Sequence, residues 1–409
     1  MRELGIAVYR GKIILDAQAP ITDGDLARIS GLLEGEIPGD LLELWQTSFG
    51  GELDYDYEVA FDDHLYSASL KEIFYIGSNH YHSLTGWIET ELEGIQDFAE
   101  ENGDPVPEKL SVIPFAGFEY LERFYVSLAP DDYGKIIIWA MGLPPAWKGR
   151  LTQDSVAMVA ESVSDLFDHL TLDVDPFADG VNEYASGRDM AARIEEIEES
   201  NPELAQKLRY LVKASVFDWK KVIEESDFEV NFTSAQLKAA RLALKSAVEH
   251  NDPALVEDLS KSGVPFDITV SGESGILPYA MTNRSFVVIE KLLDLNLDLG
   301  ESPIIYASEC SDGLLRRLVG CGVRFDEEAM FSAAEYGAIE GAVELAKSKQ
   351  LLESQTIDAT REKALERAKN KEEDASAVES GKLGSYLTAE EYREQAESLR
   401  RFGEALCND

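Results

Sequence analysis

Residues 37–59 constrain the fold of this chain more than any other stretch. Pro38 suits the first turn of a helix, where its missing N–H needs no partner, and three apolar residues follow at i, i+3 and i+4, positions that share one helical face. That face carries Leu41, Leu44 and Trp45. Gly50 and Gly51 accept positive φ and therefore predict the end of the helix. We expect a short helix that stops at two glycines, with a strand directly after it.

The strand expected at residues 52–59 alternates strictly between acidic and apolar side chains. Successive side chains of a strand point to opposite faces. The acidic face carries Glu52, Asp54, Asp56 and Glu58, and the apolar face carries Leu53, Tyr55, Tyr57 and Val59. Four like charges in a row repel one another, so we expect a cation or a basic partner on the acidic face. We expect Tyr55 and Tyr57 to lie in the core.

The rest of residues 1–172 predicts a sheet built from consecutive strands between helices. Helical spacing runs over residues 87–102, apolar runs predict strands over 112–115, 124–128 and 136–139, and a last helix is expected over 156–170. This order predicts an α+β domain at 1–172 whose central antiparallel sheet is flanked by helices. Residues 173–203 are acidic and interrupted by glycine and proline, which predicts a linker with one solvated helix.

Residues 204–350 are expected to be nearly all helical, and their sequence shows a period. Turn residues Gly263, Asn296 and Gly322 lie 33 and 26 positions apart, and alanines upstream of them recur at a similar spacing. The alanines are Ala214, Ala247, Ala280 and Ala307. The period predicts an all-α solenoid, and the mixed-charge residues 351–409 are expected to form its helical cap.

Within that period, a small residue in the first helix and a Val-x-x-Leu-Leu-like run in the second resemble ankyrin repeats. Traces of the Thr-Pro-Leu-His motif of such repeats stand at residues 275–280 and 303–307. Another kind of helical solenoid is the alternative. The ankyrin-like resemblance implies a surface for protein binding or scaffolding.

The net charge of −41 narrows the classes of partner. Nucleic acid is repelled by such a charge, whereas a basic protein is attracted and steered toward it. Solubility alone is the simpler alternative. Residues 1–172 hold 31 Asp and Glu against 10 Lys and Arg, a net charge of −21, so we expect the partner site in this part of the chain.

The sequence also bears on the compartment. No run of about 18 apolar residues occurs, so no membrane span and no membrane partner are expected. The first residues lack the apolar core of a signal peptide, and three cysteines without metal-ligand spacing fit a reducing compartment. We therefore expect a cytoplasmic protein without disulfides, in which Cys310 and Cys321 are buried thiols.

Motifs of catalysis are missing from the sequence. It contains no nucleotide-binding glycine motif and no nucleophile elbow. His80 and His82 could offer two metal ligands, but no further Cys or His lies near them in sequence, and strand alternation does not supply the glycine turns of a calcium loop. We expect no metal site, no cofactor and no catalytic residue, hence a binding protein rather than an enzyme.

Several motifs of the first part of the chain together resemble the SUKH superfamily (Smi/Knr-like). They are Ile37-Pro38 with Asp40-Leu41, the helix end Phe49-Gly50-Gly51, the strands at residues 112–117, 125–128 and 134–139, and the closing residues 159–170. The likeness covers about residues 20–172. It implies an intracellular immunity protein, because bacterial members of this superfamily neutralise secreted toxins, often nucleases or deaminases, by binding them. Ankyrin arrays also occur in immunity proteins, and fungal relatives act as cell-wall and signalling scaffolds.

These observations give one functional hypothesis and one alternative. The hypothesis is a cytosolic immunity protein that binds a cognate bacterial polymorphic or contact-dependent toxin, whose basic nucleic-acid-targeting domain is occluded by acidic side chains. We expect part of that surface from Glu52, Asp54, Asp56, Glu58, Asp62 and Asp63. The alternative is an intracellular protein-binding scaffold or regulator, related to the cell wall or to signalling, without a toxin partner.

Overall fold

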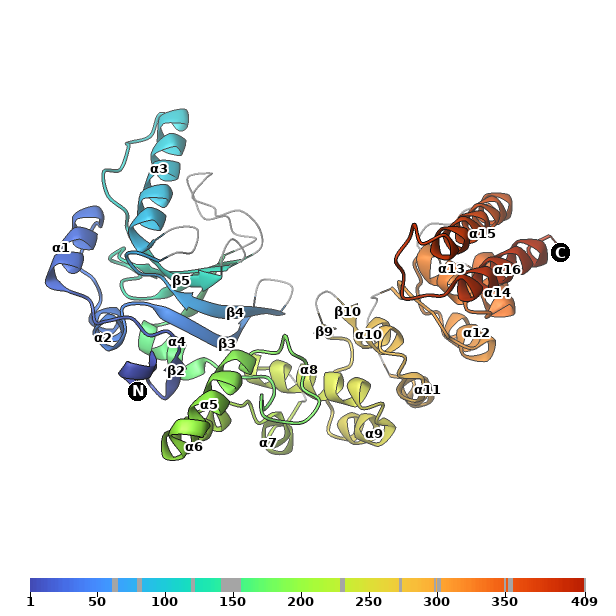
Figure 1. Ribbon diagram of the computed structural model, residues 1–409, viewed down its shortest axis with the longest axis horizontal. Helices are drawn as coiled ribbons and strands as arrows, with labels where there is room; N and C mark the ends of the chain where they lie inside the picture. The colour runs from blue at the N-terminus through green and yellow to red at the C-terminus, as the bar shows by residue number, and fades with distance from the viewer. Residues whose placement is uncertain are drawn as a thin grey trace. The chain divides into compact units, whose positions relative to one another are not determined.

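The structure is a computed structural model, and it describes residues 1–60, 65–78, 83–118, 122–140, 156–228, 232–271, 274–297, 299, 303–348, 351 and 356–407. The chain divides into two compact units, Met1–Phe217 and Asp218–Asp409. In Figure 1 the first unit runs from blue to green and the second from green to red. The first boundary therefore lies 45 residues beyond the one expected from the sequence, residue 172.

The first unit contains a sheet and seven helical elements in the described residues. Its helices are η1 (Arg2–Leu4), α1 (Asp23–Leu32), α2 (Gly39–Thr47), α3 (Leu84–Asn102), α4 (Val163–His169), α5 (Arg188–Ser200) and α6 (Pro202–Ala214). A small hairpin is formed by β1 (Ala7–Tyr9) and β2 (Lys12–Ile14). The main sheet consists of β3 (Gly51–Ala60), β4 (Leu65–Ile73), β5 (Val112–Phe118), β6 (Glu122–Ser127), β7 (Ile136–Ala140) and β8 (Val156–Ala160).

The main sheet is an antiparallel meander in which each strand pairs with the next one along the chain, from β3 to β8. The sheet curls so far that its first and last strands meet. The hydroxyl of Tyr57 on β3 donates a hydrogen bond to the carbonyl of Val159 on β8. The same Tyr57 ring meets Phe124 of β6 edge-on, with the ring centroids 6.4 Å apart. The predicted α+β domain with a central antiparallel sheet is confirmed.

The predicted helix end at two glycines is wrong in position, because α2 already ends at Thr47 and the glycines lead into β3 three residues later. The structure shows why both positions need glycine. Gly50 and Gly51 have φ of +114° and +134°. A Cβ at Gly51 would lie 2.6 Å from the side chain of Ile14 and 2.7 Å from the carbonyl oxygen of Leu15. The backbone of β3 therefore packs directly on the β1–β2 hairpin, since Glu52 and Leu15 exchange two backbone hydrogen bonds there.

The start of α2 is tied to the start of α4 through one carboxylate. The carboxylate of Asp40 accepts hydrogen bonds from the amide of Leu41 at 3.0 Å and from the amide of Ser164 at 3.2 Å. The hydroxyl of Tyr9 lies 3.1 Å from that of Ser164 and donates to the carbonyl of Asp40 at 3.3 Å. Asp40 therefore satisfies free amides at two helix N-termini, which are otherwise left without partners.

The helix expected over residues 156–170 is wrong in its first third. Residues 156–160 form strand β8, and the helix α4 begins at Val163, after the cap residue Ser162. Val156, Val159 and Val163 are spaced like one helical face, but β7 has an edge that β8 completes with ladder hydrogen bonds. Pairing along a sheet edge outweighs a weak local preference.

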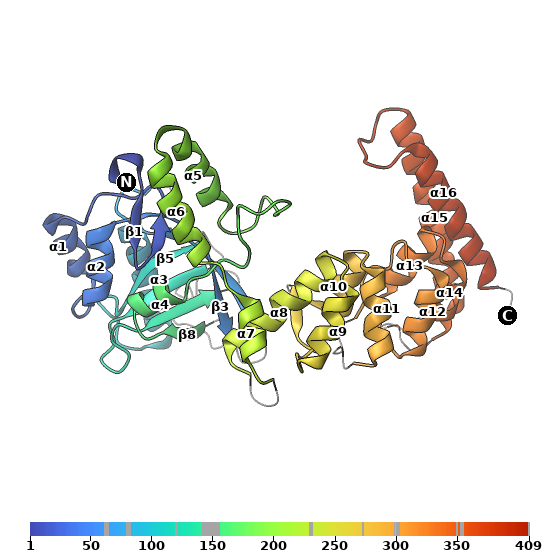
Figure 2. The same cartoon turned by 90° about the horizontal axis from the view of Figure 1, so that it is seen from below.

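The expected linker at residues 173–203 belongs to the first unit. Helices α5 and α6 lie side by side (Figure 2). Met190, Ile194 and Ile197 of α5 are buried in the same core as the sheet, as are Leu208 and Val212 of α6. This segment is therefore a folded extension of the first unit.

The second unit is helical apart from one short hairpin in the described residues. Its helices are α7 (Trp219–Glu225), α8 (Ser234–Glu249), α9 (Pro253–Lys261), α10 (Ile276–Thr282), α11 (Phe286–Leu295), α12 (Asp312–Gly320), α13 (Glu327–Glu335), α14 (Ile339–Lys347), α15 (Ile357–Glu379) and α16 (Ala389–Ala405). The hairpin is formed by β9 (Thr269–Ser271) and β10 (Ser274–Gly275).

The turns of the second unit recur in two series of left-handed residues. One series is the predicted set Gly263, Asn296 and Gly322, with φ of +74°, +51° and +81°. The other is Asn251, Arg284, Glu309 and Gly337. Two helices are joined to earlier segments by bonds of one type, because the amide of Val288 donates to the side chain of Asn251 at 3.4 Å and the amide of Gly341 donates to that of Asp312 at 2.7 Å. Residues 303–311, ahead of the turn at Gly322, contain no helix.

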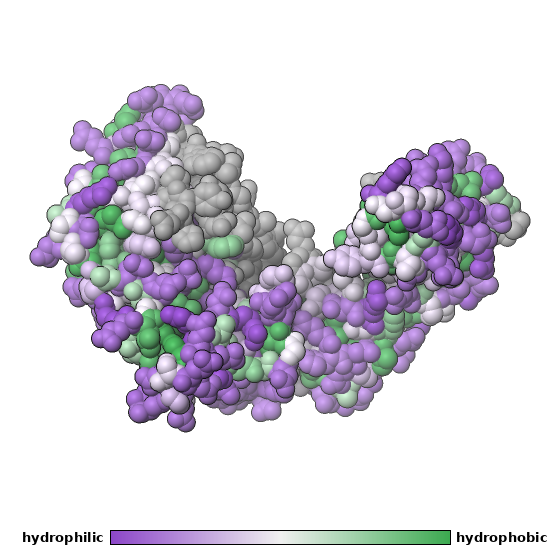
Figure 3. Space-filling model, viewed as in Figure 1, coloured by the Kyte–Doolittle hydropathy of each residue, from purple (hydrophilic) through white to green (hydrophobic). Residues whose placement is uncertain are grey.

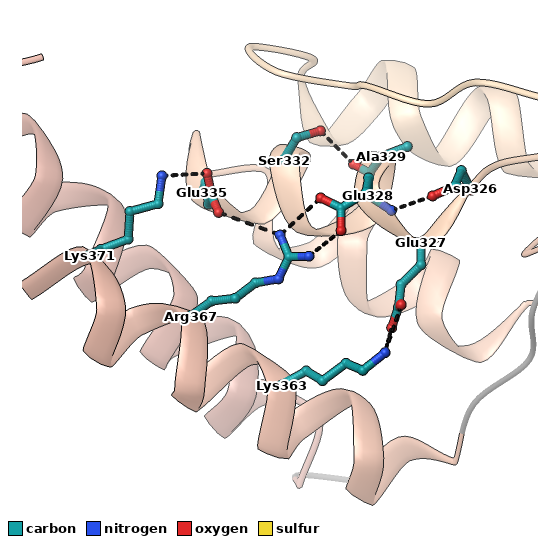
Figure 4. Close-up of polar contacts among 9 residues, drawn as sticks. All are labelled: Asp326, Glu327, Glu328, Ala329, Ser332, Glu335, Lys363, Arg367 and Lys371. Carbon is teal, nitrogen blue, oxygen red and sulfur yellow. Dashed lines mark hydrogen bonds and ion pairs between the residues drawn. The ribbon is translucent and has the colours of Figure 1, made fainter. Parts of the chain in front are cut away.

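The last two helices form a hairpin that packs on α13 through ion pairs from α15 (Figure 4) and through buried apolar side chains of α16. Arg367 of α15 pairs with Glu328 and Glu335, and its guanidinium carbon lies 4.2 Å from the ring centroid of Phe331. Lys363 and Lys371 extend this basic stripe, pairing with Glu327 at 2.9 Å and with Glu335 at 3.0 Å. Basic residues four apart on α15 thus face an acidic stripe of α13.

The cysteines correct one expectation. Cys310 is buried, and burial raises the pKa of its thiol to about 12. Cys321 and Cys407 are exposed, so the expectation of a buried Cys321 is wrong.

Gly51→Ala should destabilise the first unit by more than about 2 kcal/mol, because the new Cβ meets backbone and the left-handed conformation is strained for alanine. Gly39→Ala is the matched control, since a Cβ there meets nothing within 4 Å and should leave the free energy of unfolding within about 1 kcal/mol of wild type. Urea unfolding measures both. Equal stability of the two variants would contradict the packing of β3 on the hairpin.

Candidate functional site

The acidic residues of β3 do not form the exposed row that the sequence predicts. Asp54 and Asp56 are 4% and 9% exposed. The pairing of β3 with β4 shifts register between Glu52 and Tyr55, which breaks the strict alternation at that point. The prediction of an acidic surface is therefore wrong for Asp54 and Asp56, while the prediction that Tyr55 and Tyr57 lie in the core is confirmed.

Both buried carboxylates hold the segment at residues 171–187, which we call the strap. Asp56 accepts hydrogen bonds from the Ser186 hydroxyl at 2.7 Å and from the amide of Asp173 at 3.3 Å. Asp54 accepts one from the amide of Gly187 at 2.6 Å and forms an ion pair with Lys71 of β4. These carboxylates are engaged within the chain.

The other four residues of the predicted surface have different positions. Glu52 is exposed and Glu58 is half-buried. Asp62 and Asp63 lie outside the described residues, as do His80 and His82. In the described part of the chain, no group of three or more His, Cys, Asp or Glu side chains could hold a metal ion. No helix in that part is long and apolar enough to cross a membrane.

A second group of charged residues is sealed in the core beside α3. Arg123 of β6 is fully buried, and its guanidinium carbon lies 3.2 Å from the ring centroid of Trp87. Glu91 lies 3.6 Å from that guanidinium and accepts a hydrogen bond from the Tyr125 hydroxyl at 2.8 Å. Burial raises the pKa of Glu91 and of Tyr125. Perturbed pKa values often mark active sites, but these groups are buried and bound to each other.

An exposed acidic surface surrounds Tyr133, in the loop between β6 and β7. Its members come from the segment that leads into α2, from α2 itself, from this loop and from the residues just before α4, and we call them the Tyr133 surface. They are Glu36, Asp40, Glu43, Asp131, Asp132, Tyr133 and Glu161. Tyr133 is 48% exposed, and burial, Glu36 and Asp40 together raise the pKa of its hydroxyl.

Three contacts hold the elements of the Tyr133 surface together. The loop turns at Gly134, whose φ of +84° places its backbone against Pro38, where an added Cβ would be 3.9 Å away. Lys135 lies 3.8 Å from Asp132 and 3.7 Å from Glu161, and so joins the loop to the start of α4. Asp40 joins α2 to α4, as described above.

Sequence reasoning missed the Tyr133 surface, although a signal exists. Acidic residues are frequent both around Pro38 and in residues 129–134, between two strands that the sequence predicts and that pair in the structure. Their proximity in space depends on how the meander and α2 pack, which no local period encodes.

Residues 20–169 match the model of the SMI1 / KNR4 family (SUKH-1). The match begins before α1, includes every strand of the main sheet and ends at the last residue of α4. The first unit therefore contains a SUKH domain, and the resemblance seen in the sequence is confirmed. No curated protein and no solved structure matches the chain.

Asp56→Ala should lower the free energy of unfolding of the first unit by about 1–3 kcal/mol, because it leaves the donors of the strap without a buried acceptor. The matched control is Glu93→Ala, at an exposed position of α3, which should change it by less than about 0.5 kcal/mol. Chemical unfolding measures both variants. A larger effect for Glu93→Ala would contradict the role of the strap.

Glu91→Gln should alter the pH dependence of stability. Because burial raises the pKa of Glu91 above its ordinary 4.5, the folded unit holds this proton more tightly than the unfolded chain does. The stability from this group is therefore present at low pH and is lost as pH rises through the raised pKa. Glutamine does not titrate, so the stability of the variant relative to wild type should increase with pH by about 1.4 kcal/mol for each unit by which the pKa is raised.

Urea unfolding from pH 4 upward measures this difference, with Glu89→Gln, an exposed residue of α3, as the control. If the relative stability of Glu91→Gln instead falls with pH, the attraction to Arg123 outweighs burial.

Proposed function

We propose that this chain is a cytosolic immunity protein that binds a cognate bacterial polymorphic or contact-dependent toxin and neutralises it. The observation that supports this proposal is the SUKH-1 match over residues 20–169. That match supports a protein partner in general. The acidity of the chain favours a basic toxin domain, of the kind that acts on nucleic acid.

In this proposal the Tyr133 surface takes the role that was predicted for the acidic residues of β3. Exposed carboxylates of Glu36, Asp131 and Glu161 would stand in for the phosphate charge that a nucleic-acid-binding toxin attracts. Tyr133 would supply the aromatic anchor, since tyrosines near the centre of an interface often carry much of the binding energy. Glu52 is the remaining exposed candidate on β3.

We infer that the second unit is a divergent ankyrin-like array that binds a further part of the toxin. The two series of left-handed turns and their repeated spacing support this inference. So do the bridges that join Ile304 to Phe325 and Phe325 to Leu351 in parallel, because equivalent segments of stacked repeats lie side by side. The inhibition would act by occlusion, without catalysis by this chain.

The test uses the C-terminal domain of the protein encoded immediately upstream, because a toxin gene beside its immunity gene is what the proposal expects. Wild-type chain should bind that domain and suppress its toxicity in co-expression. Tyr133→Ala should weaken binding about 10- to 100-fold, mainly through faster dissociation. The double variant Glu36→Lys and Asp131→Lys should slow association about tenfold or more at low salt, and added salt should shrink that difference.

The controls are Tyr184→Ala and Glu101→Lys, at exposed positions of the first unit that do not belong to the Tyr133 surface. Equal losses in these controls would refute the Tyr133 surface but leave the immunity function standing. Failure of the wild-type chain to bind the upstream product would refute the immunity function and favour the scaffold.

A further inference from the structure

An apolar hollow of about 690 Å³ lies on the first unit, between α6 and the N-terminal hairpin. One wall is a stripe of α6, and the other comes from β1 and the first residue. The apolar lining consists of Met1, Val8, Leu204, Leu208, Tyr210 and Leu211. Figure 3 shows an apolar patch between the N-terminus and α6 on the face in view.

Several large apolar residues that line this hollow are exposed to solvent. Tyr210 is 72% exposed and Met1 is 52% exposed. Leu204 and Leu211 pack on the core of the unit with one side only, as half-buried residues. Large apolar side chains gathered at one place on a surface mark sites of interaction.

The spacing of the stripe indicates the shape of an occupant. The half-buried Leu204 and Leu211 stand at i and i+7, so they span about 10 Å along α6, and the buried Leu208 lies between them at the floor of the hollow. A groove with anchors at this spacing suits an amphipathic helix. A small molecule suits it less, because small-molecule sites enclose most of the ligand surface, and here Tyr210 stands largely in solvent.

The net charge of the first unit favours a cationic helix over a helix of a second copy of this chain. The rim pair Glu203 and Lys207, 3.2 Å apart, neutralises itself. The field that an approaching partner meets is therefore that of the whole unit, whose residues 1–217 hold 41 Asp and Glu against 15 Lys and Arg. This net charge of −26 repels a second copy of the chain and attracts a cationic helix.

The position of the hollow in the chain sets it apart from the family domain. All of its lining residues lie at 1–8 or 203–211, outside the matched residues 20–169. The segments that flank the SUKH domain therefore build a surface that the domain itself does not contain.

We propose that this hollow is a second docking site of the first unit, which binds a basic amphipathic helix of a partner protein. The leucines of α6 contact the apolar face of that helix, and Tyr210 packs against its edge. The net negative charge of the unit attracts its cationic face. This inference goes beyond the proposed function and does not depend on the identity of any toxin.

The test measures binding of a fluorescently labelled leucine–lysine peptide, with leucines at i, i+3, i+4 and i+7, to the full-length chain by anisotropy. Tyr210→Ala should weaken binding about tenfold. Tyr184→Ala is the matched control, because Tyr184 is 86% exposed in the same unit and does not line the hollow. Leu204→Glu should abolish binding, and circular dichroism checks that this variant is folded.

Each other outcome overturns the proposal. Equal binding of a scrambled leucine–lysine peptide would show general attraction to an acidic chain. Equal binding of a leucine–glutamate peptide would show that charge does not select the helix. Equal loss in Tyr184→Ala would place the site elsewhere, and no binding up to about 100 µM would show that the hollow takes no such helix.

Discussion

The hydrogen bonds from the strap to Asp54 and Asp56 are the interaction on which the rest of the first unit depends. They place two carboxylates in the interior, where a charge is tolerated only if it is paired or well bonded. Lys71, the amides of residues 173 and 187 and the hydroxyl of Ser186 meet that need. In consequence the chain that leaves the sheet after α4 is held against β3, and α5 and α6 are brought onto the same core.

The sequence predicted much of the fold because the local patterns are strong. The helix α2, the strands β6 and β7 and the helix α3 all follow from the spacing of apolar residues. The turn residues Gly263, Asn296 and Gly322 were found by their period and are left-handed in the structure. Strand β8 was not found, because Val156, Val159 and Val163 also fit a helix and only the open edge of β7 selects the strand.

The site was harder to predict than the fold, for a physical reason. Alternation along β3 shows that two faces exist, but it does not show which of them is solvated. Acidic side chains suggest solvent, yet Asp54 and Asp56 face a segment more than 110 residues later in the chain. The reverse holds for Tyr133, whose acidic neighbours come from three separate elements. Both outcomes depend on contacts between distant residues, and no local pattern reports them.

The strap also has an evolutionary consequence. The family match ends at residue 169, but the donors to the Asp56 side chain and the backbone partner of Asp54 lie at residues 173–187. Recombination that joined this SUKH domain to a new C-terminal module at the end of the match would remove these donors and leave Asp54 with Lys71 alone. The segment that must be inherited as one piece is therefore longer than the matched domain. We expect recombination to keep the chain intact up to about residue 217, where the first unit ends.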